Sequence, residues 1–503
     1  MLKMMFIKKQ IGAAITVAMA VAVVSCSHAL PSDYSLAGRM ASISPDYAGL
    51  VIPRNIAPLT FRINEDADDF LTCFRTSADP DGFVVCGQAL DIPVDRWHRL
   101  LADADTVYAD IYTCKGGHWT RYTTVANAVA DSIDPYISYR LIEPGYIGFE
   151  NMAICQRNLE NFDEHEIFNN QAMSTEKEGQ CINCHSYQDY NRDGNMQMHV
   201  RVGYGGTLVG HGGSLKKINL KTPETVSAGV YPSWHPTEPL IAYSNNTTSQ
   251  TFHTRDLNKV EVQDAASDLV LYDLDTDRLC FIANNPAELE TFPCWHPDGL
   301  SLWYVSAHVP EMTEKEMALY QALNYKDFKY DLYRKKFDPQ TRRFEEADTV
   351  YRASALGKSV TLPRPSPDGR FLMFTQGGFG TFHIWHRDAD LYMLDIATGE
   401  TRPLDEINSD DVESYHSWSS SGKWVIFSSR RDDGSYTRLY LTHMGADGRF
   451  SKPFVLPQAS PDADGCLFKS YNIPEFMVRP VDFSRSEFIE ALEKDPVNVV
   501  MQQ

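Results

Sequence analysis

Two cysteines and a histidine in the middle of the chain have the spacing of a covalent cofactor site. Cys181, Cys184 and His185 form the pattern C-x-x-C-H. Two thiols at this spacing can add to the two vinyl groups of one porphyrin, and the histidine then binds the iron from below. We therefore expect one covalently attached haem, with His185 as its proximal ligand. The pair must lie on one side of a helical turn, so the spacing predicts a short helical segment.

Other chemistries of two nearby thiols are less well matched. A zinc site needs a second pair of ligands, and the sequence has no second C-x-x-C. A disulfide or a vestigial pair stays open as an alternative. A sixth iron ligand is to be sought nearby, and His199 and Met196 are the joint candidates. Over these few residues the chain resembles c-type cytochromes, which implies electron transfer or redox sensing.

The first residues carry a targeting pattern. Lys3, Lys8 and Lys9 precede an apolar run from residue 11 to 24, which is too short to span a membrane. The run ends at Cys26 with a serine before it, and this resembles a bacterial lipoprotein signal. The resemblance implies a signal peptide at 1–25, a lipid on Cys26 and an outer-membrane lipoprotein of the cell envelope that faces the periplasm. A plain secretory signal is the alternative.

Composition narrows the set of partners. The chain has 46 basic and 67 acidic residues, a formal charge of −21, and 43% of its residues are apolar. Such an acidic surface argues against nucleic acid as a partner, and it predicts contact with the membrane only through the lipid anchor. A redox partner or another envelope protein remains compatible with this charge.

The first half of the chain divides into three predicted segments. Residues 26–58 carry proline and serine and are expected to form a tether. Short β-rich runs with turn residues between them predict a small β-sandwich-like domain at 59–142. Residues 143–213 are assigned to the haem segment, with a helix expected at 161–168.

A repeat runs through the second half. Four short segments align, each followed by an apolar strand, a polar loop and a further β-rich run; they are Tyr231–Pro236, Phe292–Gly299, Leu362–Gly369 and Tyr415–Gly422. This turn-strand-loop-strand unit is typical of propeller blades. The Pro-Asp-Gly turns resemble the TolB-like, WD-related (PD40-type) repeat, which implies a β-propeller at 214–503. We expect five or six blades, with residues 468–474 forming a blade that is completed by residues 215–220. Residues 312–329 are expected to form a helical insertion in the second blade.

Two blade loops carry matching polar strings. One contains His253 and Arg255, and the other contains His383, His386 and Arg387. Equivalent places in two blades put both loops on one propeller face, where they could bind a metal, an anion or a haem propionate. The alternative is that these side chains hydrogen-bond the loops to each other.

Together these patterns predict a mainly β envelope lipoprotein. Its C-terminal propeller would follow the β-sandwich-like domain and the short helical haem segment. The expected function is electron transfer or redox sensing by one haem c, with the propeller recognising a partner or ligand. The alternative is a propeller scaffold with no redox role. An electron carrier or binding protein is favoured over an enzyme, and peroxidase-like activity is the minor possibility because no catalytic motif stands out.

Overall fold

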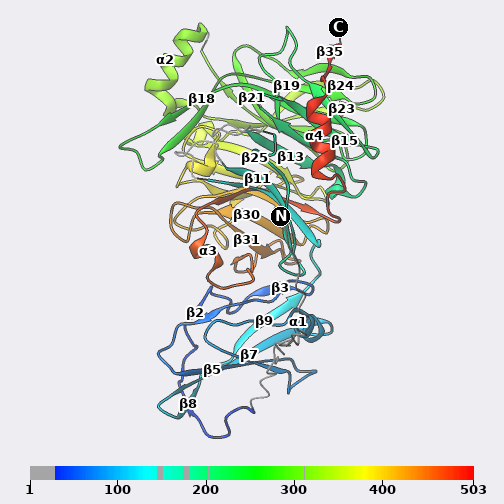
Figure 1. The fold of residues 1–503 in the computed structure, drawn as a ribbon. Coiled ribbons are helices and arrows are strands. Elements are labelled where there is room, and N and C mark those ends of the chain that lie inside the picture. Colours follow the sequence, from blue (N-terminus) through cyan, green and yellow to red (C-terminus); the bar gives the residue numbers. More distant parts are fainter. Residues whose placement is uncertain (1–28, 144–150, 174–180, 202, 311, 503) are drawn as a thin grey trace, which may run out of the picture.

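The computed structural model describes residues 29–143, 151–173, 181–201, 203–310 and 312–502. The protein is mainly β and contains a β-propeller. In Figure 1 a smaller N-terminal body, coloured blue to cyan, lies below a larger body that contains the rest of the chain. Among the described residues, no helix is long and apolar enough to cross a membrane.

The N-terminal body is built on one sheet rather than on the two packed sheets of a sandwich. Its strand order is β1-β8-β7-β5-β6, with β9 paired to both β7 and β3. The turn between β5 and β6 contains Gly82, where an added Cβ would meet the backbone of Phe74, so only glycine fits. The elements are β1 (Ser35–Leu36), β3 (Val51–Pro53), β5 (Asp69–Arg75), β6 (Phe83–Cys86), β7 (Thr106–Lys115), β8 (His118–Arg121), β9 (Val125–Ala130) and helix α1 (Val94–Leu101), with a separate pair β2 (Ile43–Ser44) and β4 (Arg62–Ile63).

One four-stranded sheet joins strands from both halves of the chain. Its order is β12-β11-β10-β33, all antiparallel. The strands are β10 (Tyr136–Ile142), β11 (Met152–Asn158), β12 (Glu164–Asn169) and β33 (Ser470–Met477). The helix expected at 161–168 is therefore wrong, because most of that stretch pairs with β11 as a strand. The C-terminal strand does borrow partners from earlier sequence, but they are β10 to β12 and not residues 215–220.

The remaining propeller strands follow one another in antiparallel runs of four. The C-x-x-C-H motif lies in the first of these runs, so the described residues of 143–213 form mainly strands and not a separate helical segment. The runs are β13 (Ile182–Tyr187), β14 (Met196–Val200), β15 (Gly206–His211) and β16 (Ser214–Asn219); β17 (Gly229–Trp234), β18 (Leu240–Phe252), β19 (Val260–Asp273) and β20 (Arg278–Ala283); β21 (Glu288–Trp295), β22 (Ser301–His308), β23 (Asp331–Asp338) and β24 (Arg343–Tyr351); β25 (Ser359–Pro365), β26 (Phe371–Gly377), β27 (Asp390–Asp395) and β28 (Thr401–Pro403); β29 (Glu413–Trp418), β30 (Trp424–Ser429), β31 (Arg438–His443) and β32 (Phe454–Val455).

A backbone bulge recurs in β33 and in the first strand of each of the five runs given above. Each bulge places one non-glycine residue at positive φ, between 46° and 54°, next to a shift in strand register. Such bulges bend a strand and redirect its side chains. All of these residues line a single cavity, so the bulged strands surround one central channel; the residues are Cys184, Tyr231, Phe292, Leu362, Tyr415 and Ile473.

Two additions modify this plan on one side of the propeller. Strands β18 and β19 continue as a long hairpin, and helix α2 (Glu314–Asn324) packs against β19. Thr313 and Glu316 form a capping box at the start of α2, which confirms the helical insertion expected at 312–329. The C-terminal segment forms α4 (Arg485–Glu493), which buries Phe488 and Leu492 against the β14 and β15 side chains, and ends in the short edge strands β34 (Val497–Asn498) and β35 (Val500–Met501).

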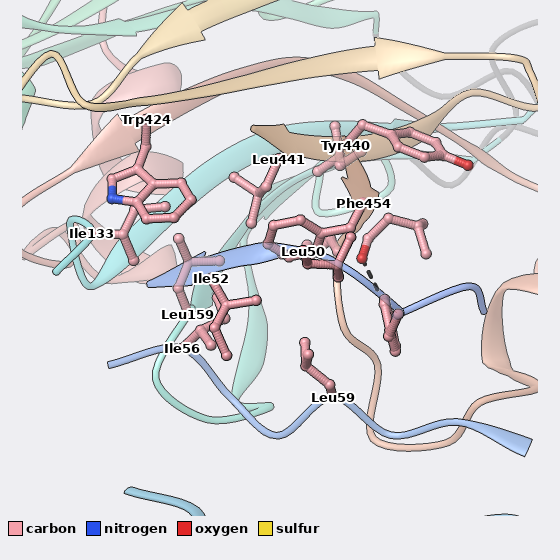
Figure 2. Close-up of a cluster of buried hydrophobic side chains, with 14 of the residues drawn as sticks. Leu50, Ile52, Ile56, Leu59, Ile133, Leu159, Trp424, Tyr440, Leu441 and Phe454 are labelled. Atoms are coloured by element: carbon pink, nitrogen blue, oxygen red, sulfur yellow. Dashed lines mark hydrogen bonds between the residues drawn. The ribbon is translucent and has the colours of Figure 1, made fainter. Parts of the chain in front are cut away.

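The two bodies share a hydrophobic core. Ile52 and Leu59 of the N-terminal body belong to the same buried cluster as Trp424 and Leu441 of the propeller (Figure 2). Tyr47 also donates a hydrogen bond of 3.2 Å to the carbonyl of Val455. Continuous apolar packing of this kind holds the N-terminal body in a fixed position against one side of the propeller.

Candidate ligand site in the propeller channel

The C-x-x-C-H motif follows the channel wall. Asn183 opens, together with Cys181, into a cavity at one end of the channel, which we call the mouth cavity. Cys184 and His185 line a narrower cavity in the middle, which we call the waist cavity. The channel wall also carries Arg364, whose guanidinium pairs with Glu475 at 2.7 Å.

Local sequence explains why the motif is a strand. Residues 184–187, Cys-His-Ser-Tyr, occupy the place that Tyr231–Trp234 and Tyr415–Trp418 occupy in their own runs. Each of these segments begins with the positive-φ residue and ends with an aromatic residue. The second cysteine and the histidine are thus a version of the bulge of the propeller repeat, and the residues on either side of them, Asn183 and Ser186, pair with β14.

This arrangement does not fit a covalently attached haem. Cys181 lines the mouth cavity and Cys184 lines the waist cavity, so the two thiols do not face one common space. The waist cavity beside His185 is about 50 Å³, which is room for a few water molecules and not for a macrocycle. Cys184 is 4% exposed. The predicted haem is therefore not supported by the geometry of these residues.

His185 is nevertheless an unusual residue. Its ring is buried, and neither ring nitrogen has a hydrogen-bond partner, although the backbone of Ile473 lies near the ring. Burial lowers the pKa of His185 to about 3, and the positive charge of Arg140 contributes in the same direction. The imidazole is consequently neutral at physiological pH.

The proposed sixth ligands lie on β14. His199 is buried, and its Nδ1 lies 3.0 Å from the hydroxyl of Thr207. Met196 packs in the apolar core beneath α4 rather than against the channel. Neither of these residues lines the waist cavity that contains His185. Cys26, the predicted lipidation site, lies outside the described residues.

The two polar blade loops meet at one of the predicted side chains, His386. His386 Nε2 lies 2.7 Å from a carboxylate oxygen of Glu261, and both side chains are fully buried. His383 bonds to the carbonyl of Phe379, and His253 stacks on Tyr325 with ring centroids 4.4 Å apart. The side chains of Arg255 and Arg387 are exposed. Among these side chains, His386 thus joins the two hairpins, whereas His383 and His253 have partners elsewhere.

The mouth cavity is the best-formed candidate site. It has a volume of about 220 Å³, and its wall combines arginines, amides and aromatic rings. Residues from strands, the β18–β19 hairpin and the loop after β26 meet there. Those with chemistry relevant to binding are Arg140, Arg201, Arg430, Glu143, Asn183, Asn472, Gln250, Tyr231, Phe382 and Trp385.

Two of these arginines are buried without an ionic partner. Arg140 is 6% exposed and Arg430 is 8% exposed, and the side chain of neither makes a hydrogen bond or ion pair with the described residues. The guanidinium of Arg430 lies 4.0 Å from the ring centre of Trp385. Burial lowers the pKa of Arg430 to about 10, even though Asp411 and Asp433 raise it, so the group stays charged at neutral pH.

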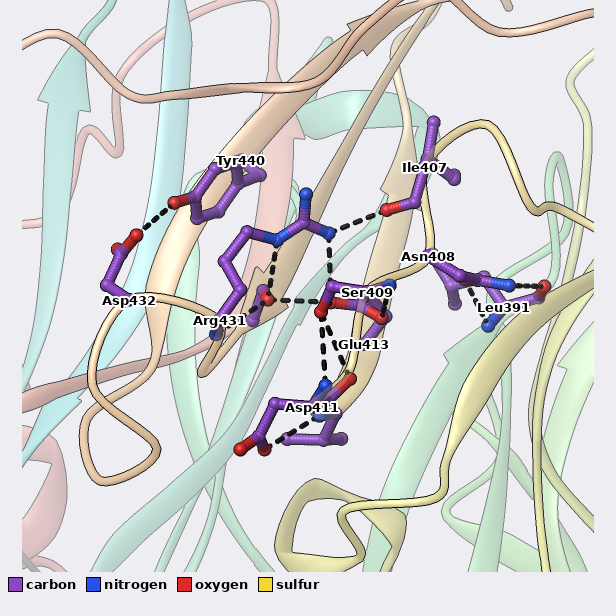
Figure 3. A network of polar contacts seen from close by, with 11 residues as sticks. Leu391, Ile407, Asn408, Ser409, Asp411, Glu413, Arg431, Asp432 and Tyr440 are labelled. Carbon is purple, nitrogen blue, oxygen red and sulfur yellow. Dashed lines mark hydrogen bonds and ion pairs between the residues drawn. The ribbon is translucent and has the colours of Figure 1, made fainter. Parts of the chain in front are cut away.

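Arg431, which follows Arg430 in the chain, has the hydrogen-bond and ionic partners that the side chain of Arg430 lacks. Arg431 donates to Glu413 at 2.8 Å, to the Ser429 hydroxyl at 3.0 Å and to the Ile407 carbonyl, as Figure 3 shows. That network fixes the loop next to Arg430. An adjoining surface hollow of about 560 Å³ shares Arg430 and Trp385 with the mouth cavity, so these two side chains separate the two spaces.

Comparisons with known proteins give the fold context. No protein family model matches the chain, and no curated protein sequence resembles it. Among solved structures, a prolyl endopeptidase matches with 10% identity over 65% of this chain and 42% of its own, at a TM-score of 0.34. Prolyl oligopeptidase B of Galerina marginata matches with 8% identity, 71% and 51% coverage and a TM-score of 0.32. The chain thus spans about half the length of these two peptidases.

A periplasmic gluconolactonase of Pseudomonas aeruginosa is also similar. It shares 12% identity over 67% of this chain and 99% of its own, with a TM-score of 0.31. At these values the comparisons concern the fold alone and carry no assignment of activity.

Proposed function

We propose that the protein is a binding protein whose propeller takes a small ligand in the mouth cavity. The observation that carries this proposal is the combination of a formed cavity with buried polar groups that have no partner among the described residues. Ligand sites are concave, with apolar and aromatic walls and a few fixed polar groups. This corresponds to the non-redox alternative derived from the sequence.

We infer also that the propeller has six blades. Six antiparallel four-stranded runs each contribute one bulged strand to the wall of the waist cavity. In this arrangement β33 is the innermost strand of a blade whose other strands are β10 to β12, so both ends of the propeller sequence close one ring. Closure of this kind leaves no open sheet edge between the first and last blades.

The binding role can be tested by blocking the cavity. Thr248 is exposed on the β18–β19 hairpin and lines the mouth cavity, so Thr248→Trp should obstruct the cavity without disturbing the core. Thermal shift measurements against acidic, neutral and basic small molecules should find at least one class that raises Tm of the natural protein and not of the variant. Leu356→Trp, at another exposed position, is the matched control.

Two results would contradict the proposal. One is that no class of compound raises Tm of the natural protein. The other is that ligands stabilise Thr248→Trp as strongly as they stabilise the control.

The envelope location stays a proposal that rests on the sequence. We propose that Cys26 carries a lipid and tethers the protein to the outer membrane on its periplasmic side. Labelled palmitate should be incorporated into the full chain expressed in a bacterium and not into Cys26→Ala. Equal labelling of both chains would contradict lipidation at this residue.

A further inference from the structure

The arginines of the mouth cavity differ from the other buried arginines. Four arginines among the described residues are more than nine-tenths buried: Arg140, Arg157, Arg430 and Arg438. Arg157 bonds to Gln458 and to the carbonyl of Pro457, and Arg438 donates to four backbone carbonyls. The side chains of the other two have no such bonds. Both of these unpaired arginines line the same cavity, although 290 positions separate them in the chain.

An unpaired buried charge is costly. Moving a guanidinium out of water costs several kcal/mol unless an anion or several hydrogen-bond acceptors replace the lost hydration. None of the described residues gives the side chain of Arg140 or Arg430 a hydrogen bond or an ion pair, although the charges of Asp411 and Asp433 raise the pKa of Arg430. The open mouth cavity lets a partner from outside the chain reach both guanidinium groups.

The net charge of the mouth cavity indicates that a partner of Arg140 and Arg430 would be an anion. Three guanidinium groups, those of Arg140, Arg201 and Arg430, face the cavity against the single carboxylate of Glu143. Glu143 also accepts a hydrogen bond of 3.0 Å from Asn151. The cavity is thus cationic in a protein whose formal charge is −21, and a planar guanidinium matches a carboxylate or phosphate in two parallel hydrogen bonds.

The remaining side chains of the cavity wall indicate that the ligand has an organic part that carries hydroxyl groups. Trp385, Phe382 and Tyr231 offer apolar ring surfaces. The side-chain oxygen of Asn183 is buried without a donor, so it can accept a hydrogen bond from a ligand hydroxyl. A bare inorganic ion would leave both kinds of surface unused.

We propose that the mouth cavity binds a small hydroxylated organic acid, with its anionic group held by Arg140 and Arg430 and its body against Trp385. This inference rests on the proposed binding function and names the class of ligand. A sugar acid and a hydroxylated metabolic acid both belong to this class.

Calorimetric titration of the full chain can test the ligand class. The probes are D-glucuronate and citrate as acids, D-glucose as the neutral counterpart and inorganic phosphate as the bare anion. We expect the acids to bind, with affinity falling as salt rises, and glucose to bind at least tenfold more weakly because it lacks the charge. Arg140→Gln and Arg430→Gln should each weaken acid binding tenfold or more. Arg255→Gln, on an exposed loop, is the matched control and should leave it unchanged.

The Tm of the two arginine variants without ligand distinguishes a binding role of Arg140 and Arg430 from a structural role. Because both arginines are unpaired, their replacement by glutamine should keep or raise Tm in the absence of ligand. A lower Tm with unchanged acid affinity would overturn the proposal and assign these residues to stability.

Three further outcomes are decisive. If glucose binds with the same affinity as the acids, the proposal of an organic acid ligand is overturned, while the proposed binding function is not. If phosphate binds and the acids do not, the proposal that the ligand has an organic part is overturned. Failure of all four probes, together with no stabilising compound for the natural protein, overturns both proposals.

Discussion

At the scale of single residues, two histidines with similar surroundings differ in the partner they have. His386 has the Glu261 carboxylate, while His185 has no hydrogen-bond partner. Both are buried, so the difference lies in which residue the fold places opposite the ring. Histidine in a polar string is often a ligand candidate, but here strand β19 supplies a carboxylate partner for Nε2 of His386.

The buried pair of His386 and Glu261 predicts a loss of stability on removal of one partner. Glu261→Leu should lower the free energy of unfolding by about 3 kcal/mol, because it leaves the imidazole without a partner in the core. Urea unfolding measures this. Arg387→Ala is the control, since its side chain is exposed and its ion pair with Asp411 is 3.8 Å long, and we expect a change below about 1 kcal/mol. Equal effects of the two changes would contradict the interpretation.

Asp264 predicts a pH-dependent effect. Burial raises its pKa to about 7, and Asn246 donates to it at 2.7 Å. Between the pKa of an unfolded aspartate, about 4, and pH 7, the folded protein holds more protons at this site, so its contribution to stability falls as pH rises. Asp264→Asn should be more stable than the natural protein at pH 8 by roughly 2 kcal/mol, and the difference should vanish near pH 4.

Urea unfolding of both proteins at pH 4, 6 and 8 checks this dependence. A difference that stays constant over the three values would mean that the Asp264 carboxyl does not titrate with the shifted pKa.

At the scale of elements, the C-x-x-C-H strand shows where sequence interpretation went wrong. The spacing of Cys181 and Cys184 suggests a helical turn, but the motif lies in a strand that pairs with β14 on both sides of a bulge at Cys184 and His185. A signal for this was present in the sequence, because Ser186 and Tyr187 match the serine and aromatic residue of Tyr415–Trp418. The match is short, and the first half of the chain has no Pro-Asp-Gly turn to accompany it.

The strand geometry predicts that the two thiols stay free. Protein produced with a cytochrome c maturation system should have the mass of the unmodified chain and give no pyridine haemochrome spectrum. The reason is that the thiols face different cavities and the waist cavity holds about 50 Å³. A mass increase of one haem that is lost in Cys181→Ala would contradict this and restore the redox function.

At the scale of the whole molecule, the N-terminal body and the propeller behave as one packing unit. Besides their shared core, Trp424 donates to the carbonyl of Asp131 at 3.1 Å, and Ser420 donates to Asp134. Residues of both bodies together form the apolar core at this interface, so neither body has a complete core of its own there.

Thermal unfolding should therefore occur in a single transition. We expect differential scanning calorimetry to show one peak, and Phe454→Ala, within the shared core, should lower Tm of the entire protein. Two resolved peaks, with only one of them moved by the change, would show that the bodies unfold separately.

The sequence by itself determined the β character, the propeller and the inserted helix. These depend on local periodicity, turn residues and caps, and the four aligned repeats lie within a contiguous half of the chain. The helix expected at 161–168 and the separate helical segment were wrong, because pairing with β11 and β14 overrode the local pattern.

Only the tertiary structure decided the candidate site. Arg140 precedes the repeats and Arg430 ends the last complete one, and no local pattern indicates that both are unpaired or that they share a cavity. Closing a ring of blades brings distant strands around one channel, and whether a buried charge has a partner depends on what that ring places beside it. For this reason the chemistry of the mouth cavity could be recognised only once the chain was folded.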